Sequence, residues 1–427
     1  MSARRWTARA RGLRGAAAGM VALGLLATGC GGDGGSSSGG KVTIRYAWWG
    51  AKDRSVMIKK TVKLFEKKHP NITVKTDFAE YADFWSKFNT QAAGGNAPDV
   101  FQNSYAFLRK YGEKNLLLDL NKQVKEGNLN LKGFRNGLEK SGDIDGKLYG
   151  VPVGANTFGF FYNPAAFKKA GVTVKDGWTW DDFFAAAKKV RKSDGTLYGS
   201  SDNAGVMYLY DLYLRQHGKA FFTEDKKLGF TKDDLKQWWN TWQQHSKAGE
   251  LVPGKKTEQA KPKATISANL SAAEFTWDNF LVRFAAETDT PLELGPLPTT
   301  DGKKTGQYLS SLMLSGSART QHPKEVAQLI DFMTHDPEVG KIMGYNRGIP
   351  ATTAQYEAYK PTGVDAKIAA YEKSVAGKLE PITPHPAGTD VAEAAFLRTY
   401  TDVTVGQSSV DKAVDQFFDE AESALGS

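Results

Sequence analysis

The first folded segment of the chain alternates strand and helix patterns, and this order constrains the fold more than any other feature. Apolar residues alternate with polar or small ones over residues 42–47, which predicts a strand. Apolar residues then recur at helical spacing over residues 58–65, with Ser55 as the expected cap and Pro70 as the stop. Residues 72–78 predict a second strand. A strand–helix–strand unit of about 35 residues is typical of an α/β fold with a mainly parallel sheet.

The N-terminus has the order of a secretory signal peptide. Five arginines lie within residues 4–14, and an uncharged run from Gly15 to Gly29 follows. That run is shorter than the roughly 20 apolar residues that span a bilayer. The sequence LATGC at 26–30 resembles the lipobox of bacterial lipoproteins, whose cysteine is lipidated on sulfur and becomes the mature N-terminus. We therefore expect a signal peptide over 1–29, a lipid anchor on Cys30 that holds the protein at the outer face of the cell membrane, and a flexible Gly/Ser tether over 30–40.

Composition and charge exclude several classes of function. Cleavage after residue 29 removes five arginines and no acidic residue, so the net charge falls from +9 to +4. So small an excess on a long chain predicts no nucleic-acid partner. Cys30 is the only cysteine, so no disulfide is expected. The six histidines lack the local spacing of a zinc site, no GxSxG motif occurs, and we expect no metal, no cofactor and no catalysis.

Six short blocks occur in a fixed order along the chain. They are FEKKHPNITV at 65–74, AGGNAPDV at 93–100, GKLYGVPV at 146–153 with FYN, AG and WTW downstream, GPLP at 295–298, RGIP at 347–350 and PITP at 381–384. Together they resemble family 1 of the extracellular solute-binding proteins, which serve carbohydrate ABC transporters and include maltose-binding protein. The resemblance covers residues 41–427.

The resemblance implies a periplasmic-binding-protein-like fold, in which hinge strands join two α/β lobes and the ligand binds in the cleft between them. The expected lobes are residues 41–155 plus 297–348 and residues 156–296 plus 349–427. Such a receptor, expected to be a monomer, closes around a sugar and delivers it to an ABC importer, whose permease subunits are energised by a cytoplasmic ATPase. Apart from the lipid anchor, no contact with the membrane is expected.

Candidate ligand contacts in the first lobe begin at the end of the first strand. A sugar has apolar C–H faces that suit aromatic rings and hydroxyls that need paired polar groups. Trp48, Trp49 and Arg54 have the spacing of a family branch with WWG followed by arginine. Alternation along the strand puts the two tryptophans on opposite faces, so one of them is expected in the cleft and either could instead belong to the lobe core. By resemblance, the next strand contributes Gln102, Asn103 and Tyr105.

The remaining candidates come from the hinges and the second lobe. Asn156 lies in the first hinge, where maltose-binding protein has an acidic residue that contacts sugar. The other positions, for which core or surface roles stay open, are Asp202, Tyr208, Phe275, Trp277, Asp278, Arg347 and His385. The tryptophans at 178, 180, 238, 239 and 242 lie at helical or capping positions, which favours packing. The number of candidate aromatics favours an oligosaccharide over a monosaccharide.

Two other functions remain open at this point. A cell-surface glycosidase needs two carboxylates beside the scissile bond. The close pairs in sequence are Asp143/Asp145, Asp181/Asp182 and Glu274/Asp278. A surface adhesin would bind glycan polymers without transport.

Overall fold

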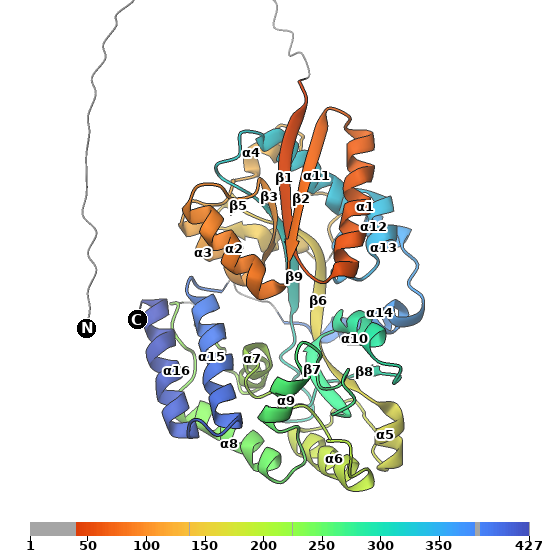
Figure 1. Ribbon diagram of the computed structural model, residues 1–427, viewed down its shortest axis with the longest axis vertical. Coiled ribbons are helices and arrows are strands. Elements are labelled where there is room, and N and C mark those ends of the chain that lie inside the picture. Colours follow the sequence, from red (N-terminus) through yellow and green to blue (C-terminus); the bar gives the residue numbers. More distant parts are fainter. Residues whose placement is uncertain (1–39, 136, 224, 381–384, 427) are drawn as a thin grey trace, which may run out of the picture. The chain divides into compact units, whose positions relative to one another are not determined.

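A computed structural model describes residues 40–426 except 136, 224 and 381–384 (Figure 1). The predicted signal peptide, Cys30, the tether up to residue 39 and the PITP block lie outside the described residues. Within the described part, no helix combines the length and the apolar character that crossing a bilayer requires.

The main sheet runs through the described chain with parallel and antiparallel pairs. Its strands, in spatial order, are β10 (Ile349–Pro350), β6 (Val151–Tyr162), β9 (Leu309–Gly316), β3 (Val100–Ser104), β1 (Val42–Trp49) and β2 (Ile72–Ala79). β1 pairs in parallel with β2 and β3, as the strand–helix–strand pattern predicts. The prediction of a mainly parallel sheet is wrong, because β9 enters antiparallel to both β3 and β6, and β10 is antiparallel to β6.

The long strand β6 takes part in two groups of strands. Its first part, up to Thr157, pairs with β9 and β10. Its last part, Phe158 to Tyr162, pairs with β7 (Ala273–Trp277) and β8 (Glu293–Gly295). The same twelve-residue strand therefore belongs to both halves of the fold.

Helices cover both faces of β1, and we call the residues buried there the sheet core. Ile44, Tyr46 and Trp48 point to one face and Ala47 and Trp49 to the other, as a strand period of two requires. The first face packs against α1 (Lys52–Lys68), α11 (Pro323–His335) and α12 (Pro337–Met343), and the second against α2 (Tyr81–Ala93) and α3 (Tyr105–Glu113).

The first helix begins earlier than its expected cap. Ala51 is the N-cap of α1, and the backbone N–H of Ser55 donates to the Ala51 carbonyl at 3.2 Å. Ser55 is therefore inside the helix, and the prediction that it caps α1 is wrong. The stretch at 324–343 forms two helices, because Asp336 ends α11 and caps α12 at Pro337.

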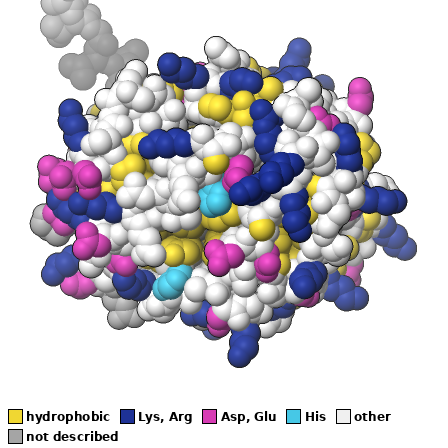
Figure 2. Space-filling model, turned by 90° about the horizontal axis from the view of Figure 1, so that it is seen from below, with side chains coloured by type: hydrophobic (Ala, Val, Ile, Leu, Met, Phe, Trp, Pro, Cys, Tyr) yellow, Lys and Arg dark blue, Asp and Glu magenta, His cyan; other side chains and the backbone are white. Residues whose placement is uncertain are grey.

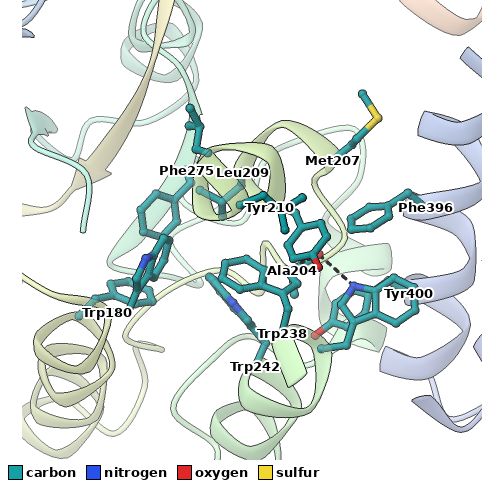
Figure 3. Close-up of a cluster of buried hydrophobic side chains, with 14 of the residues drawn as sticks. Trp180, Ala204, Met207, Leu209, Tyr210, Trp238, Trp242, Phe275, Phe396 and Tyr400 are labelled. Atoms are coloured by element: carbon teal, nitrogen blue, oxygen red, sulfur yellow. Dashed lines mark hydrogen bonds between the residues drawn. The ribbon is translucent and has the colours of Figure 1, made fainter. Parts of the chain in front are cut away.

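A second core contains the clustered tryptophans, and we call it the tryptophan core. Trp238, Trp239 and Trp242 lie on α8 (Lys232–Lys247). Trp180 begins α6 (Trp180–Ser193), and Trp178 lies two residues before it. Figure 3 shows Trp180, Trp238 and Trp242 in this core. The indole N–H of Trp238 donates to the Ala204 carbonyl at 3.0 Å. These contacts confirm the predicted packing role. The surrounding helices are α6 (Trp180–Ser193), α7 (Met207–Gln216), α8 (Lys232–Lys247), α15 (Thr389–Thr404) and α16 (Val410–Leu425).

The other elements complete the two halves. They are α4 (Asn121–Lys125), α5 (Pro164–Lys169), α9 (Gly254–Ala260), α10 (Phe280–Glu287), α13 (Thr353–Ala358), α14 (Gly363–Val375), the short strands β4 (Asp143–Ile144) and β5 (Lys147–Leu148), and the 3-10 turns η1 (Leu138–Gly142) and η2 (Ala376–Lys378).

Two connecting segments make contacts that bear on the division into lobes. Leu297 and Tyr308 are buried in the tryptophan core, and the Gln216 side chain donates to the carbonyls of Pro298 and Thr305. After this segment, the chain returns to the sheet core at β9. Conversely, the segment around α13 stays with the sheet core, because the Gln355 amide donates to the Met333 carbonyl at 3.1 Å.

Candidate functional site

Four aromatic side chains gather where the tryptophan core approaches the sheet core. The ring of Trp277, at the end of β7, lies 5.2 Å from Tyr208 on α7 and 6.3 Å from Tyr308, just before β9. The ring of His385 lies 6.3 Å from Tyr208. Trp277 and Tyr208 are only half-buried. We call these four residues, together with Glu393, the aromatic site.

The sheet core faces this site through the N-terminus of α2 and through α3. Ser104 caps α3 by accepting from the Ala106 N–H at 3.2 Å, which fixes the position of the first helical residue, Tyr105. The Tyr105 ring lies 6.0 Å from His385. The pKa of Tyr81 on α2 is raised, first by loss of solvation and second by the negative charge of Glu393. Elements of both cores therefore meet at the aromatic site.

The acidic group of the site is held partly protonated near neutral pH. Burial raises the pKa of Glu393 to about 7, and the neighbouring charge of Asp390 acts in the same direction. The Tyr208 hydroxyl donates to Glu393 Oε2 at 3.3 Å and opposes this rise. Such a carboxyl accepts hydrogen bonds when ionised and donates one when protonated.

The basic groups beside the site are paired or neutral. Burial lowers the pKa of His385 to about 4, so its imidazole is uncharged at neutral pH. The Arg215 guanidinium lies 4.7 Å from the centre of the Tyr308 ring and bonds the Asp211 carboxylate at 3.0 Å. Aromatic faces beside neutral and paired polar groups fit a ligand with flat apolar faces and hydroxyl-bearing edges.

A second polar group lies at the N-terminus of α1 and connects it to the segment before β10. Arg54 donates through Nε to Asn346 Oδ1 at 2.7 Å and through a terminal nitrogen to the Asn346 carbonyl at 2.6 Å. Burial and then the charge of Arg347 lower the pKa of Arg54 to about 10. Arg347 is itself buried beside Tyr46. The described contacts of Arg54 thus tie the start of α1 to the region where β10 meets β6.

The two tryptophans of the WWG sequence occupy opposite faces of β1. Trp48 is fully buried in the sheet core, with its ring 6.2 Å from Phe78. Trp49 packs edge-on against Tyr81 at 5.6 Å. Of the two tryptophans, Trp49 is therefore the one that contacts Tyr81, the residue of α2 that faces the aromatic site.

The polar candidates on the first-lobe strands contact backbone and neighbouring side chains. The Gln102 amide donates to the Trp49 carbonyl at 3.4 Å. The Asn103 amide donates to Ser315 Oγ at 3.0 Å. Asn156 Oδ1 lies so near Gly348, at φ +90°, that a Cβ there would approach it to 2.5 Å. Only a glycine fits the chain beside Asn156.

Three second-lobe candidates lie inside the fold. Phe275 is buried in the tryptophan core. Asp202 accepts from the Tyr400 hydroxyl at 2.9 Å, and burial raises its pKa to about 6. Asp278 accepts from the Thr157 N–H at 3.2 Å, and burial, with the neighbouring charge of Glu372, raises its pKa. The structure thus brings together Tyr105, Tyr208, Trp277 and His385. Phe275, Asp202 and Asp278 make their main contacts elsewhere in the fold.

Sequence reasoning missed several residues at the site. They are Tyr81, Arg215, Tyr308 and Glu393. No local motif marks them, because each reaches the site through tertiary packing between segments that are far apart in the chain.

The carboxylate pairs that favoured a glycosidase have separate structural contacts. Asp182 completes the capping box of α6 with Thr179. Asp145 pairs with Arg109 at 3.1 Å. Glu274 accepts from Ser201 Oγ at 3.0 Å, whereas its sequence neighbour Asp278 contacts β6. Among the described residues there is also no group of three or more His, Cys, Asp or Glu side chains placed to hold a metal ion.

The mixed α/β architecture is that of the periplasmic solute-binding proteins. The chain belongs to the bacterial extracellular solute-binding protein family, whose model matches residues 50–339. This assignment places it among extracytoplasmic binding receptors and not among enzymes.

Individual relatives agree with the family. The chain is 28% identical over 329 residues to the Multiple sugar-binding protein of Streptococcus mutans, which covers 69% of this chain and 71% of that protein. It is similar to a solved family 1 extracellular solute-binding protein from Alicyclobacillus acidocaldarius, at 29% identity, a TM-score of 0.66, and coverage of 91% of this chain and 99% of that one. A periplasmic oligogalacturonide-binding protein from Yersinia enterocolitica, solved with saturated digalacturonic acid, shares the fold at 23% identity and a TM-score of 0.79, with coverage of 90% and 99%.

Proposed function

We propose that the protein is a lipid-anchored receptor that binds an oligosaccharide at the aromatic site and delivers it to an ABC importer. The observation that carries the proposal is the group formed by Trp277, Tyr208 and Tyr308, with Glu393 and His385 beside the rings. Rings that stack on C–H faces and polar groups that bond hydroxyls are the two requirements of sugar binding. The Streptococcus mutans relative, named as a multiple sugar-binding protein, supports the same class of ligand.

The packing of the connecting segments supports a revised division into lobes. We place residues 41–155 and 309–358 in the first lobe and residues 156–308 and 359–426 in the second. The hinge strands are then β6 and β9, and the aromatic site lies between the lobes. Ligand that binds the closed arrangement more tightly shifts the population toward it.

A thermal-shift screen over neutral and acidic mono-, di- and trisaccharides tests the ligand class. A sugar that binds only the native state raises the melting temperature. We expect an oligosaccharide to give the largest shift and Trp277→Ala to abolish most of it. Tyr356→Ala is the matched control, because Tyr356 is an exposed aromatic on α13 of the first lobe.

Three outcomes of the screen would count against the proposal. Release of reducing ends from the best ligand would indicate a glycosidase. Binding only to insoluble polymer would indicate an adhesin. An unchanged shift in Trp277→Ala would move the ligand away from the aromatic site.

The anchor is tested separately through Cys30. Cys30→Ser is expected to release the protein from the membrane into the medium, because the described chain holds no helix able to span a bilayer. Retention of this variant in the membrane fraction would contradict the lipid anchor and leave the sugar site unaffected.

A further inference from the structure

Two ion pairs connect α3 of the sheet core to elements of the tryptophan core. Lys110 on α3 pairs with Asp390 at the start of α15. Glu113, at the end of α3, pairs with Lys226 at 3.4 Å. Both pairs lie on helices or turns that border the aromatic site, since Tyr105 begins α3 and Glu393 follows Asp390 on α15.

The partners of each pair are fixed to different cores. α3 is held by Phe107, Leu108 and Tyr111, which are buried in the sheet core. α15 is held by Phe396 and Tyr400, which are buried in the tryptophan core. A hinge motion that separates the cores therefore has to break both ion pairs, whereas ion pairs within one core would survive it.

Solvent exposure ranks the two pairs. The Lys110 and Asp390 side chains are 15% and 21% exposed, whereas those of Lys226 and Glu113 are 53% and 41% exposed. Exposed pairs contribute little because water and salt screen them, and partly buried pairs are screened less. Asp390 also lies in the first turn of α15, where the positive end of the helix dipole favours a carboxylate.

We propose that the Lys110–Asp390 ion pair is a closing contact that forms only when the two lobes are together and thereby sets the closed fraction of the receptor and its affinity for ligand. The inference rests on the two-lobe arrangement of the proposed function. A contact that is present in only one of two conformations favours that conformation by the free energy that the contact contributes. Glu113–Lys226 is a weaker outer contact of the same kind. The pair acts on affinity by positioning the lobes and does not touch the ligand.

Closure can be measured without any ligand. In full-length protein carrying Cys30→Ser no other cysteine remains, so Ser86→Cys on α2 and Lys412→Cys on α16 accept a fluorophore pair specifically. Both positions are exposed and belong to opposite cores. Single-molecule energy transfer then reports the ratio of open to closed molecules in ligand-free buffer at low and high salt.

The variants form a charge-swap cycle. We expect Lys110→Asp and Asp390→Lys each to raise the open-to-closed ratio about fivefold, and the double swap to return it toward the wild-type value. High salt should reduce the difference between wild type and single variants. Lys87→Glu is the matched control, because its ion pair with Asp77 joins α2 to β2 within the sheet core and should leave the ratio unchanged.

Two results would overturn the closing contact. One is an open-to-closed ratio that the single variants leave unchanged while their melting temperatures stay within a few degrees of wild type. The other is a double swap that behaves as the sum of the single variants. The sugar screen is independent of both, so a receptor that closes through this pair and binds no sugar would contradict only the proposed ligand class.

Discussion

Aromatic side chains gather in two neighbouring regions of this molecule, and their rings have different surroundings. In the tryptophan core, Trp239 and Trp242 have no exposed surface, and the indole of Trp239 donates to the Ala204 carbonyl at 3.2 Å. In the aromatic site, Trp277 and Tyr208 stay half-buried, and the Tyr208 hydroxyl bonds a carboxyl group, that of Glu393. Aromatic residues thus stabilise the fold in the first region, and in the second they line the site at which we propose that a ligand binds. Burial and the polar partner distinguish the two roles, and the number of tryptophans does not.

The largest expected effect compares one tryptophan from each region. Trp239→Ala should lower the free energy of unfolding by about 3–5 kcal/mol, because it leaves a cavity in a closed core. Trp277→Ala should cost at most about 2 kcal/mol, because Trp277 is less buried than Trp239. Chemical denaturation of both variants measures the difference. Equal losses would show that Trp277 belongs to the core and would remove it from the site.

A smaller effect is expected from a single hydroxyl group. Tyr208→Phe removes the hydrogen bond to Glu393 and should weaken binding of the best sugar from the screen about fivefold, which corresponds to about 1 kcal/mol. Tyr210→Phe is the control from the tryptophan core, because its buried hydroxyl has no hydrogen-bond partner among the described residues. Titration calorimetry compares the two variants. A loss in Tyr210→Phe as large as that in Tyr208→Phe would indicate general disturbance of α7.

The smallest effect concerns the dependence of stability on pH. Glu393 ionises near 4.3 in the unfolded chain and near 7 in the folded one, so the native state holds an extra proton between these values. Its raised pKa therefore favours the folded state fully below about pH 4, and this contribution is lost as the pH rises through 7. Glu393→Gln should gain stability relative to wild type between pH 5 and pH 8, by an amount on the order of 1 kcal/mol or less.

The control for the pH experiment is Glu357→Gln, an exposed position on α13. Its difference from wild type should stay constant over the same range. A constant difference for Glu393→Gln as well would mean that the Glu393 carboxyl is ionised at neutral pH like a surface group.

Local patterns in the sequence were enough for much of the fold. The alternation at β1, the helical spacing of α1 and the strand pattern of β2 each depend on a few adjacent residues, and each is confirmed. The antiparallel entry of β9 was not predictable, because strand direction depends on where a distant segment returns. Ser55 failed as a cap because α1 already begins at Lys52, where its N-cap, Ala51, provides no side-chain hydrogen bond.

The site was predictable only in part. The resemblance named Trp277, Tyr208, Tyr105 and His385 as ligand contacts, and the structure brings these four side chains together. Their role in binding stays a prediction. The surroundings of the other candidates depend on which face of a strand or helix each one occupies. Trp48 and Phe275, for example, are buried in the cores. The position of Glu393 depends on how α15 is rotated about its axis. The position of Tyr308 depends on residues 297–308, after which the chain returns to the sheet. Neither position can be predicted from the spacing of residues that are close in sequence.

The pairing of β9 has a consequence for how the chain acquires its structure after synthesis. β9 joins β3, and the Asn103–Ser315 hydrogen bond closes a loop of 212 residues. Until the ribosome has made the segment at 309–316, β3 and β6 both lack a neighbour in the middle of the sheet. Contacts so remote in sequence form slowly, and incomplete sheets expose apolar surface. We therefore expect the sheet to be completed late, only after the segment at 309–316 has been synthesised.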